Sequence, residues 1–395
     1  MNAPPFLQIV EKLEGFVGKL PASIQKPVLH ELTPLKELFL KQRPPRIVLT
    51  GSHKTPVQEV VAALFAAAQP GDLRDVLMEV FRWQRTSVGG HGYISLLDAR
   101  GAETAVLPKI EDELRRESAD VFLHVIDGNS ARPVLVRELE TLERVASLRS
   151  ADEKAAPIVG VSLVLPKTAA TAEQNTTGNA RSKLETALIE RADLRPRVTE
   201  VLEIEVPLTG DTARPGAARL MSLLAQILPN EARVEMVRIS RDRQAQAQIA
   251  QMLVKSTSAI STAVGAQPIP LADLPILTAL QLGMVSGIMY ISGRDRSMRA
   301  ATEFVGALGV NVGAGMVLRE GARAMLKFFP GWGNVVCGMV AGAGTYALGK
   351  AATVYFLEGV TLKDARRTYA ALRKKQPRAR LTTRSQAGSE PRHEA

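Results

Sequence analysis

A glycine-containing loop follows the first strand-like apolar run of the chain, and its residues could bind phosphate. The run Arg46–Thr50 (RIVLT) is followed by the loop GSHKTPVQ at residues 51–58. A loop of the form G-x-x-x-x-G-K-[ST] holds phosphate because its backbone N–H groups and lysine surround the anion while its hydroxyl binds magnesium. Gly51 occupies the first glycine position, and Lys54 lies three positions before the motif lysine. The other motif positions carry Pro56, Val57 and Gln58.

Two further loops carry residues that could complete such a site. The sequence D-A-R-G, from Asp98 to Gly101, follows the apolar run Tyr93–Leu97. The sequence P-K-T-A at residues 166–169 contains Lys167 and follows the run Ile158–Leu165. We therefore take Gly51, Lys54, Asp98, Gly101 and Lys167 as candidate residues of one anion or nucleotide site.

The elements that would position these loops alternate between strand and helix. Continuous apolar runs are typical of strands buried on both faces, and helical stretches between them indicate βαβ units and a mostly parallel sheet. The predicted strands are Arg46–Thr50, Tyr93–Leu97, Val121–Ile126, Ile158–Leu165 and Val201–Val206. We assign residues 44–235 to this α/β domain. An amphipathic helical lead-in at residues 1–43 precedes it, and we expect prolines to break this lead-in into short helices: Pro21, Pro27 and Pro34.

In strand order and terminal loops, residues 44–230 resemble a small GTPase domain of the Era-like or translation-factor-like group, which implies a P-loop fold. The resemblance implies that Asp98 assists magnesium, that the Gly101 N–H senses the terminal phosphate, and that Thr86 is the switch threonine. It also implies that Lys167 is the remnant of the guanine-reading N-K-x-D loop, whose Asn and Asp are absent. Without that Asp, the polar groups of a bound guanine would be buried without partners, which costs about 1–3 kcal/mol.

These losses favour a degenerate, vestigial nucleotide site without catalytic residues. Two alternatives stay open: a generic α/β domain that never bound nucleotide, and a residual GTP binder with an unusual loop. We expect no metal site and no cofactor, with GTP or GDP and magnesium only if residual binding survives. The five histidines are scattered in the sequence, and we expect His124 to be a core residue because it lies in an apolar run.

The C-terminal third is apolar and rich in glycine, although the mean hydropathy of the whole chain is only +0.01. The stretches Leu274–Gly293 and Phe328–Gly349 carry no charged residue, and about 20 such residues can span a bilayer. We assign residues 236–360 to an all-α helical domain in which 274–293 and 331–357 could insert. Glycines four residues apart favour close helix packing: Gly309 with Gly313, and Gly338 with Gly342.

Residues 260–359 resemble the bacterial domain of unknown function 697, which commonly follows a GTPase domain. The residues that carry the resemblance are Pro268–Pro275, Leu280–Gln281, Gly293, Pro330–Gly331 and Thr345–Gly349. It implies a membrane location and no particular reaction. Spanning by both stretches would place basic residues of the connecting segment outside, which the positive-inside rule disfavours. A hairpin in one leaflet, a bundle that docks reversibly and a very apolar water-soluble core remain alternatives.

The segment 361–395 is a basic tail, which we expect to be disordered at its end. Between Thr361 and Arg384 it carries nine Lys or Arg against one acid, Asp364. Such a run favours the anionic inner leaflet, with a solvated tail and nucleic acid as the alternatives. We expect no nucleic-acid partner, because only Tyr369 is available there for base stacking.

Together these features predict a membrane-associated pseudo-GTPase at the cytoplasmic face of the inner membrane, peripheral or partly inserted. Its expected role is that of a non-catalytic scaffold or regulator that recruits a protein partner or a second copy of itself. The alternatives are a GTP-binding switch that controls membrane association and a membrane-perturbing effector.

Overall fold

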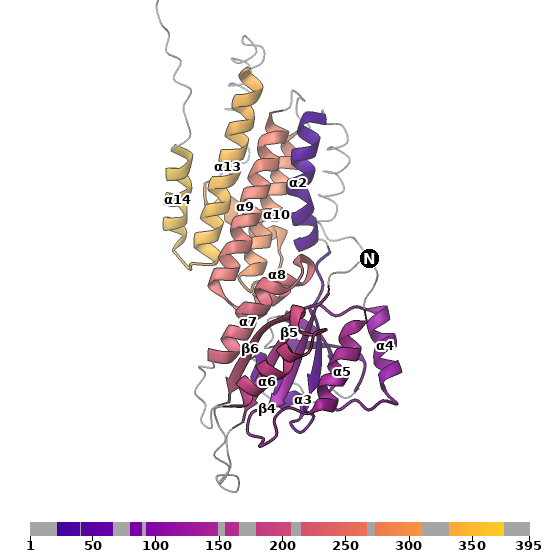
Figure 1. Ribbon diagram of the computed structural model, residues 1–395. Coiled ribbons are helices and arrows are strands. Elements are labelled where there is room, and N and C mark those ends of the chain that lie inside the picture. Colours follow the sequence, from indigo (N-terminus) through magenta and orange to yellow (C-terminus); the bar gives the residue numbers. More distant parts are fainter. Residues whose placement is uncertain are drawn as a thin grey trace, which may run out of the picture.

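An α/β domain and an elongated helical bundle make up the chain (Figure 1). The computed structural model describes residues 22–39, 41–65, 80–88, 92–148, 155–165, 179–206, 215–266, 273–309 and 332–374. The candidate residue Lys167, as well as Gly313 and the end of the basic tail, lie outside these ranges.

The α/β domain is built on a six-stranded sheet with the order β2-β3-β1-β4-β5-β6. Its strands are β1 (Arg46–Gly51), β2 (Trp83–Val88), β3 (Gly92–Asp98), β4 (Val121–Asp127), β5 (Ile158–Val164) and β6 (Val198–Glu205). All neighbouring pairs are parallel except β2 with β3. The predicted mostly parallel sheet is therefore confirmed.

The strand β2 was not predicted, because its sequence WQRTSV is polar and only two of its side chains are buried. It lies at the edge of the sheet, where a strand needs no continuous apolar run. Thr86 is one of its buried residues and pairs with Ile94, four residues before Asp98 on β3. That separation is about 13 Å at the strand rise per residue. Thr86 therefore lies buried within the sheet, apart from Asp98, and its expected switch role stays a prediction.

Helices cover both faces of the sheet. One face packs on α3 (Val57–Phe65) and α7 (Pro215–Ile227). The other face packs on α4 (Leu107–Arg116), α5 (Val136–Ser147) and α6 (Ala180–Glu190), with the short 3-10 turn η3 (Arg195–Arg197) before β6. The helices after β1 and after β3 thus leave the sheet to opposite faces.

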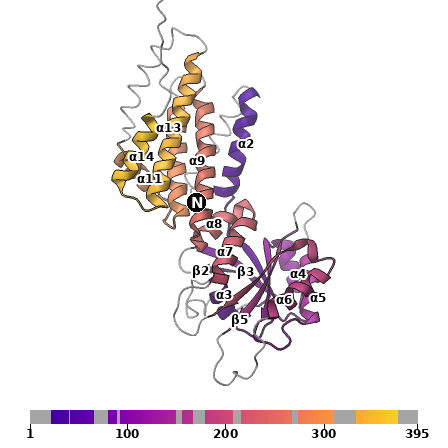
Figure 2. The ribbon, with the colours of Figure 1, turned by 60° about the vertical axis from the view of Figure 1, so that its left-hand side comes forward.

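The remaining helices form the bundle: α2 (Ala22–Phe39), α8 (Asn230–Ser240), α9 (Arg243–Gly265), α10 (Asp273–Ile291), α11 (Met298–Ala307), α13 (Trp332–Phe356) and α14 (Leu362–Lys374). The helices α9 and α13 lie side by side (Figures 1 and 2). No helix within the described ranges, α10 and α13 included, combines the length and the apolarity that a membrane span requires.

Pro27 and Pro34 do not break the lead-in helix, because α2 runs unbroken from Ala22 to Phe39, and Pro21 lies outside the described residues. A proline inside a helix costs about 3 kcal/mol. Tertiary packing offsets this cost, since five apolar side chains of α2 are buried: Val28, Leu32, Leu35, Leu38 and Phe39. The helix packs on α9 and α8, so it belongs to the bundle.

The glycines of α13 allow close packing against α9. A Cβ atom at Gly342 would lie 1.8 Å from the Thr262 Oγ1 atom, and one at Gly338 would lie 2.7 Å from the Thr262 carbonyl oxygen. The tight packing predicted for Gly338 and Gly342 is therefore present. Gly309 has another role, because it follows α11 with a φ of +77° and a Cβ there would meet no atom within 4 Å.

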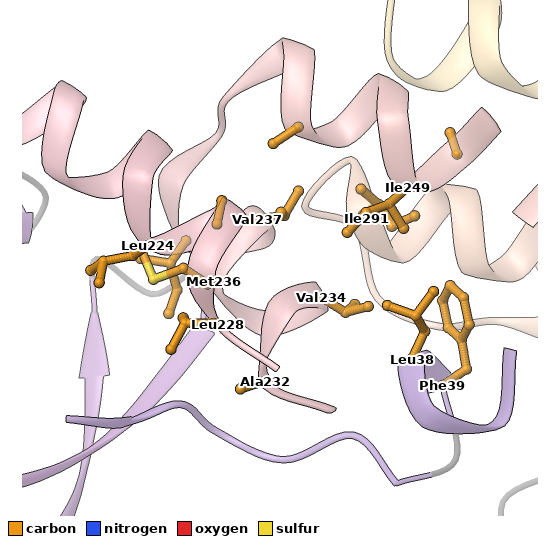
Figure 3. Packing of buried hydrophobic residues seen from close by; sticks show 14 of the residues in the cluster. Leu38, Phe39, Leu224, Leu228, Ala232, Val234, Met236, Val237, Ile249 and Ile291 are labelled. Atoms are coloured by element: carbon orange, nitrogen blue, oxygen red, sulfur yellow. The ribbon is translucent and has the colours of Figure 1, made fainter. Parts of the chain in front are cut away.

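The helix α8 joins the two parts of the chain. Figure 3 shows Met236 of α8 beside Leu224 of α7 and beside Leu228, which directly follows α7. It also shows Val234 of α8 beside Leu38 of α2. These residues belong to one hydrophobic cluster that extends from the sheet into the bundle. The predicted boundary between residues 235 and 236 falls inside this helix.

A buried carboxylate links the same elements by hydrogen bonds. Glu235 of α8 is 5% exposed and accepts hydrogen bonds from the Tyr93 backbone N–H (2.9 Å), the Gln42 amide (2.8 Å) and the Tyr290 hydroxyl (2.7 Å). These donors come from β3, from the segment before β1 and from α10. Burial and then the hydrogen bond to Glu235 raise the pKa of Tyr290.

Candidate functional site at the carboxyl edge of the sheet

The loops that follow β1 and β3 meet at the carboxyl edge of the sheet. In open α/β sheets ligands bind at this edge, where neighbouring strands send their helices to opposite faces. The structure brings three of the predicted residues together here. Leu49 pairs with Asp98 across β1 and β3, and the Gly101 backbone N–H donates to the Gly51 carbonyl oxygen over 3.3 Å.

Position 51 requires glycine because its backbone packs directly against β4. Its φ is +100°, and a Cβ atom there would lie 2.2 Å from the Val125 carbonyl oxygen. The next residue, Ser52, donates its backbone N–H to that same oxygen over 2.8 Å. The start of the loop is therefore fixed to the sheet, and this N–H group is committed within the protein.

Arg100 fills the interior of this loop. Its Nε and Nη2 atoms donate to the Oδ1 and Oδ2 atoms of Asp98 over 2.8 and 2.9 Å. Its Nη1 atom donates to the Thr55 carbonyl oxygen over 2.9 Å and to the Ser52 carbonyl oxygen over 3.3 Å. The Arg100 side chain is only 3% exposed. The guanidinium is thus held by a bidentate carboxylate and by two carbonyl groups of the loop.

This arrangement has the opposite polarity to a phosphate cradle. A phosphate loop presents N–H groups and a lysine to an anion. Here the loop presents carbonyl oxygens and a carboxylate, which suit a cation, and Arg100 supplies that cation from within the chain. Both Asp98 oxygens already accept hydrogen bonds from Arg100. The residues present do not fit a nucleotide phosphate with its magnesium ion.

Gly101 lies against the same loop, although it is exposed. Its φ is +66°, and a Cβ atom there would lie 2.7 Å from the His53 Nδ1 atom. The His53 ring therefore lies against Gly101, whose N–H already bonds to Gly51. This geometry leaves the Gly101 N–H directed into the protein, in contrast to its expected role toward a terminal phosphate.

Lys54 lies apart from this cluster of backbone groups. It is exposed in the loop, and its charge acts on Glu138 in the first turn of α5. Burial raises the pKa of Glu138, and the Lys54 ammonium partly opposes that rise. Lys54 therefore faces the α5 side of the loop, while Arg100 takes the central position.

A buried polar pair lies in the strands beneath the loop. The Thr50 Oγ1 atom and the His124 Nδ1 atom are 3.0 Å apart, and both side chains are fully buried. His124 is thus a core residue, as expected. Burial lowers the pKa of His124 from its usual 6.5 to about 4, so the ring is neutral at physiological pH.

Sequence reasoning missed the role of Arg100 and left His53 without a partner. Two acceptors of Arg100 are backbone carbonyl groups, which no residue type reveals. One signal was available in the sequence: an arginine two residues after Asp98 accompanies the loss of the loop lysine. Within the described ranges, no group of three or more His, Cys, Asp or Glu could hold a metal ion.

A cavity of about 760 Å³ lies at the opposite, amino edge of the sheet. Two of its charged lining residues bind each other, because Arg43 donates to both oxygens of Asp120 over 2.6 and 2.7 Å. Asp120 also accepts the Arg46 backbone N–H over 2.8 Å. We interpret these contacts as an anchor for the chain entering β1.

Comparison with known proteins yields a partial likeness. No family model matches the chain. Part of the chain is similar to magnetosome membrane protein 22 of Magnetospirillum gryphiswaldense, with 28% identity over 132 residues. This match covers 31% of the present chain and 66% of the relative, just under two thirds of its length. The chain therefore shares a segment with a protein that is named for a membrane.

Proposed function

We propose that this chain is a membrane-associated pseudo-GTPase that acts as a non-catalytic scaffold or regulator and recruits a protein partner. The observation that carries the proposal is the position of Arg100. Its guanidinium binds Asp98 and the carbonyl groups of Ser52 and Thr55 where a nucleotide-binding protein of this kind would hold phosphate and magnesium.

The strand order supports descent from a GTPase-type domain. The sheet combines five parallel strands with one antiparallel edge strand, and Gly51, Asp98 and Gly101 lie at its switch point. These features agree with the resemblance drawn from the sequence. The phosphate-binding chemistry has been replaced while the scaffold has been kept.

Two observations support a peripheral membrane role. The name of the similar magnetosome membrane protein 22 places that relative at a membrane. In the present chain, α13 exposes apolar side chains while the adjacent α14 exposes basic ones. Apolar and basic groups side by side are typical of surfaces that bind anionic lipid.

Exposed apolar side chains beside the candidate site support partner recruitment. Leu135 and Val136 at the start of α5 are 44% and 66% exposed. They lie close in sequence to Glu138, on which Lys54 acts. A surface that combines apolar and charged groups suits a protein partner.

The test is a phosphate-release assay on the full chain with GTP and magnesium, with and without anionic vesicles. A working GTPase serves as the positive control. The proposal predicts release at the level of a heat-denatured sample under both conditions. Guanine-specific, magnesium-dependent release would contradict it, and vesicle leakage caused by the chain would favour a membrane-perturbing effector.

A GTP-binding switch is the second candidate, because the structure gathers Gly51, Asp98 and Gly101 at one edge. Nucleotide would then have to displace Arg100 from Asp98. This candidate predicts a saturable affinity for GTP over ATP, even if hydrolysis is slow, and equilibrium binding to the full chain distinguishes it from the scaffold.

A further inference from the structure

One surface of the bundle combines an apolar stripe with a basic face. Resting on the proposed membrane role, we propose that this surface docks on an anionic lipid bilayer. The apolar stripe consists of Met339, Val340 and Tyr346 of α13. The basic face consists of Lys363, Arg366, Arg367, Arg373 and Lys374 of α14.

The apolar stripe is open although the rest of α13 is packed. Met339, Val340 and Tyr346 are 47%, 51% and 38% exposed. The side of α13 that carries Gly338 and Gly342 contacts α9. At 100° per residue, Met339 and Tyr346 lie on one flank of the helix, about 60–80° from those glycines, and Val340 lies about opposite them. Val340 therefore faces away from the α9 contact, and Met339 and Tyr346 lie beside it.

The basic face lies on the outer side of α14. Ala365 is the buried residue of this helix, and all five cations of the basic face are exposed. Arg366 donates to the Ala307 carbonyl oxygen. Thr361 caps the start of the helix: its hydroxyl accepts the Asp364 backbone N–H and donates to the Asp364 carboxylate, which also pairs with Arg367. Most of the positive charge of the helix therefore has no nearby carboxylate among the described residues.

The two features lie next to each other. Figure 1 shows α14 alongside the C-terminal half of α13, so that the first turns of α13 extend past the end of α14. Arg373 and Lys374 lie in the last turn of α14, at the end past which α13 extends. Within α13 itself, the Lys350 Nζ atom lies 5.8 Å from the centre of the Tyr346 ring.

An anionic bilayer fits this combination best. Tyrosine and lysine are enriched at membrane interfaces, where the ring or stem contacts apolar groups and the polar end contacts headgroups. Three exposed apolar residues can enter the headgroup boundary, while neighbouring cations contact anionic lipid. A stable protein interface usually buries about 800 Å² on each side, which is more than this stripe offers.

The test is flotation of the full chain with two kinds of vesicle. One consists of phosphatidylcholine alone, and the other also contains about 30% of the anionic lipid phosphatidylglycerol. Replacing Arg373 and Lys374 by glutamine (R373Q/K374Q) is expected to lower partitioning about 25-fold, since each basic residue contributes about fivefold near an anionic leaflet. The M339S/V340S variant is expected to lower it about tenfold, because less apolar surface enters the headgroup region.

Matched controls carry the same changes elsewhere. Arg181 and Lys183 on α6 are exposed cations, and R181Q/K183Q should bind like the unmodified chain. Val80 and Ile189 are exposed apolar residues of the α/β domain, so V80S/I189S should also leave binding unchanged. Thermal melting of every variant establishes that it is folded.

The outcomes separate this surface from the proposed function. If the unmodified chain fails to bind either vesicle, the membrane role itself is wrong. If it binds but the two test variants bind equally well, the membrane role stands and this surface is the wrong one. A dimer that M339S/V340S abolishes, or a lower melting temperature of that variant with unchanged lipid binding, would show that protein covers the stripe and would overturn the proposal.

Discussion

Arg100 supplies from within the chain the cation that the loop after β1 and the Asp98 carboxylate hold. The guanidinium takes a position between Asp98 and two loop carbonyl groups. Arginine suits this place because its planar fork donates to a carboxylate in a bidentate manner and still has a further nitrogen for other acceptors. Any anion entering the loop would have to break all of these bonds.

Removal of Arg100 should therefore destabilise the fold strongly. The R100A variant leaves the Asp98 carboxylate without its partner, and losing one side of a buried pair costs about 3 kcal/mol or more. The R100K variant should fall between R100A and the unmodified chain, because lysine cannot form the bidentate contact. Urea unfolding of the full chain measures the loss.

Arg115 supplies the matched control for this substitution. It is 62% exposed on α4 and pairs with Glu111 and Asp112 at the surface. Surface pairs contribute about 0–1 kcal/mol, so R115A should have a small effect. Equal losses for R100A and R115A would contradict a central role for Arg100.

Some residues of the site could be predicted from the sequence and others could not. Gly51, Asp98 and Gly101 were predictable because each follows an apolar strand, and the ends of parallel strands meet at one edge. The role of Arg100 was not predictable, because the carbonyl groups that hold it come from the backbone of another loop. The neutral state of His124 follows from its burial, which its position in an apolar run already indicated.

His124 should make the stability of the protein depend on pH. Its pKa is about 4 in the folded state against the usual 6.5 when unfolded. Above pH 6.5 neither state is protonated, so the stability is fully present. As the pH falls from 6.5 to 4, the unfolded chain binds a proton that the folded chain does not. The free energy of unfolding then falls by up to about 1.4 kcal/mol per pH unit.

A glutamine at position 124 removes this contribution. The difference in unfolding free energy between the unmodified chain and H124Q should shrink by about 2 kcal/mol between pH 7.5 and pH 5. Urea unfolding at a series of pH values gives this difference, and contributions from other groups cancel in the comparison. A difference that stays constant over the range would show that the ring titrates normally.

At the scale of elements, glycine sets the distance between α13 and α9. A Cβ atom at Gly342 would overlap the Thr262 Oγ1 atom at 1.8 Å and approach the Ser258 carbonyl oxygen at 3.1 Å. Gly344 lies in the same helix, and a Cβ atom there would meet nothing within 4 Å. The two glycines therefore form a natural pair for testing packing against helix propensity.

The G342A variant should destabilise the chain by about 1–3 kcal/mol, because α13 must move away from α9. The G344A variant should instead stabilise it by about 0.5–1 kcal/mol, because alanine favours the helix where space is free. Thermal melting of both variants measures the contrast. A gain in stability for G342A would mean that the two helices are not closely packed at this point.

The strands that are buried along most of their length were the easiest elements to predict from the sequence. The strands β4 and β5 are buried almost along their whole length and appear in the sequence as continuous apolar runs. The edge strand β2 lacks such a run because only two of its side chains are buried. The helix α2 continues through Pro27 and Pro34 because packing on α9 outweighs the local cost, and that packing partner is distant in the sequence.

At the scale of the whole molecule, the α/β domain and the bundle share one core. The cluster on one face of the sheet continues through α8 into α2, α9 and α10 (Figure 3). Glu235 adds hydrogen bonds across the same region. Composition indicated two parts of different character, but it did not reveal that α8 packs on both. Binding experiments should therefore use the full chain.

The central claim is that Arg100 has replaced the nucleotide ligand of a GTPase-type site. The most direct measurement is thermal melting of the full chain with GTP, GDP or ATP, each with magnesium. A ligand at 100 times its dissociation constant would add about 2.7 kcal/mol to the stability and raise the melting temperature by a few degrees. We predict no shift with any nucleotide. A guanine-specific, magnesium-dependent rise in melting temperature would contradict the account and identify the chain as a nucleotide switch.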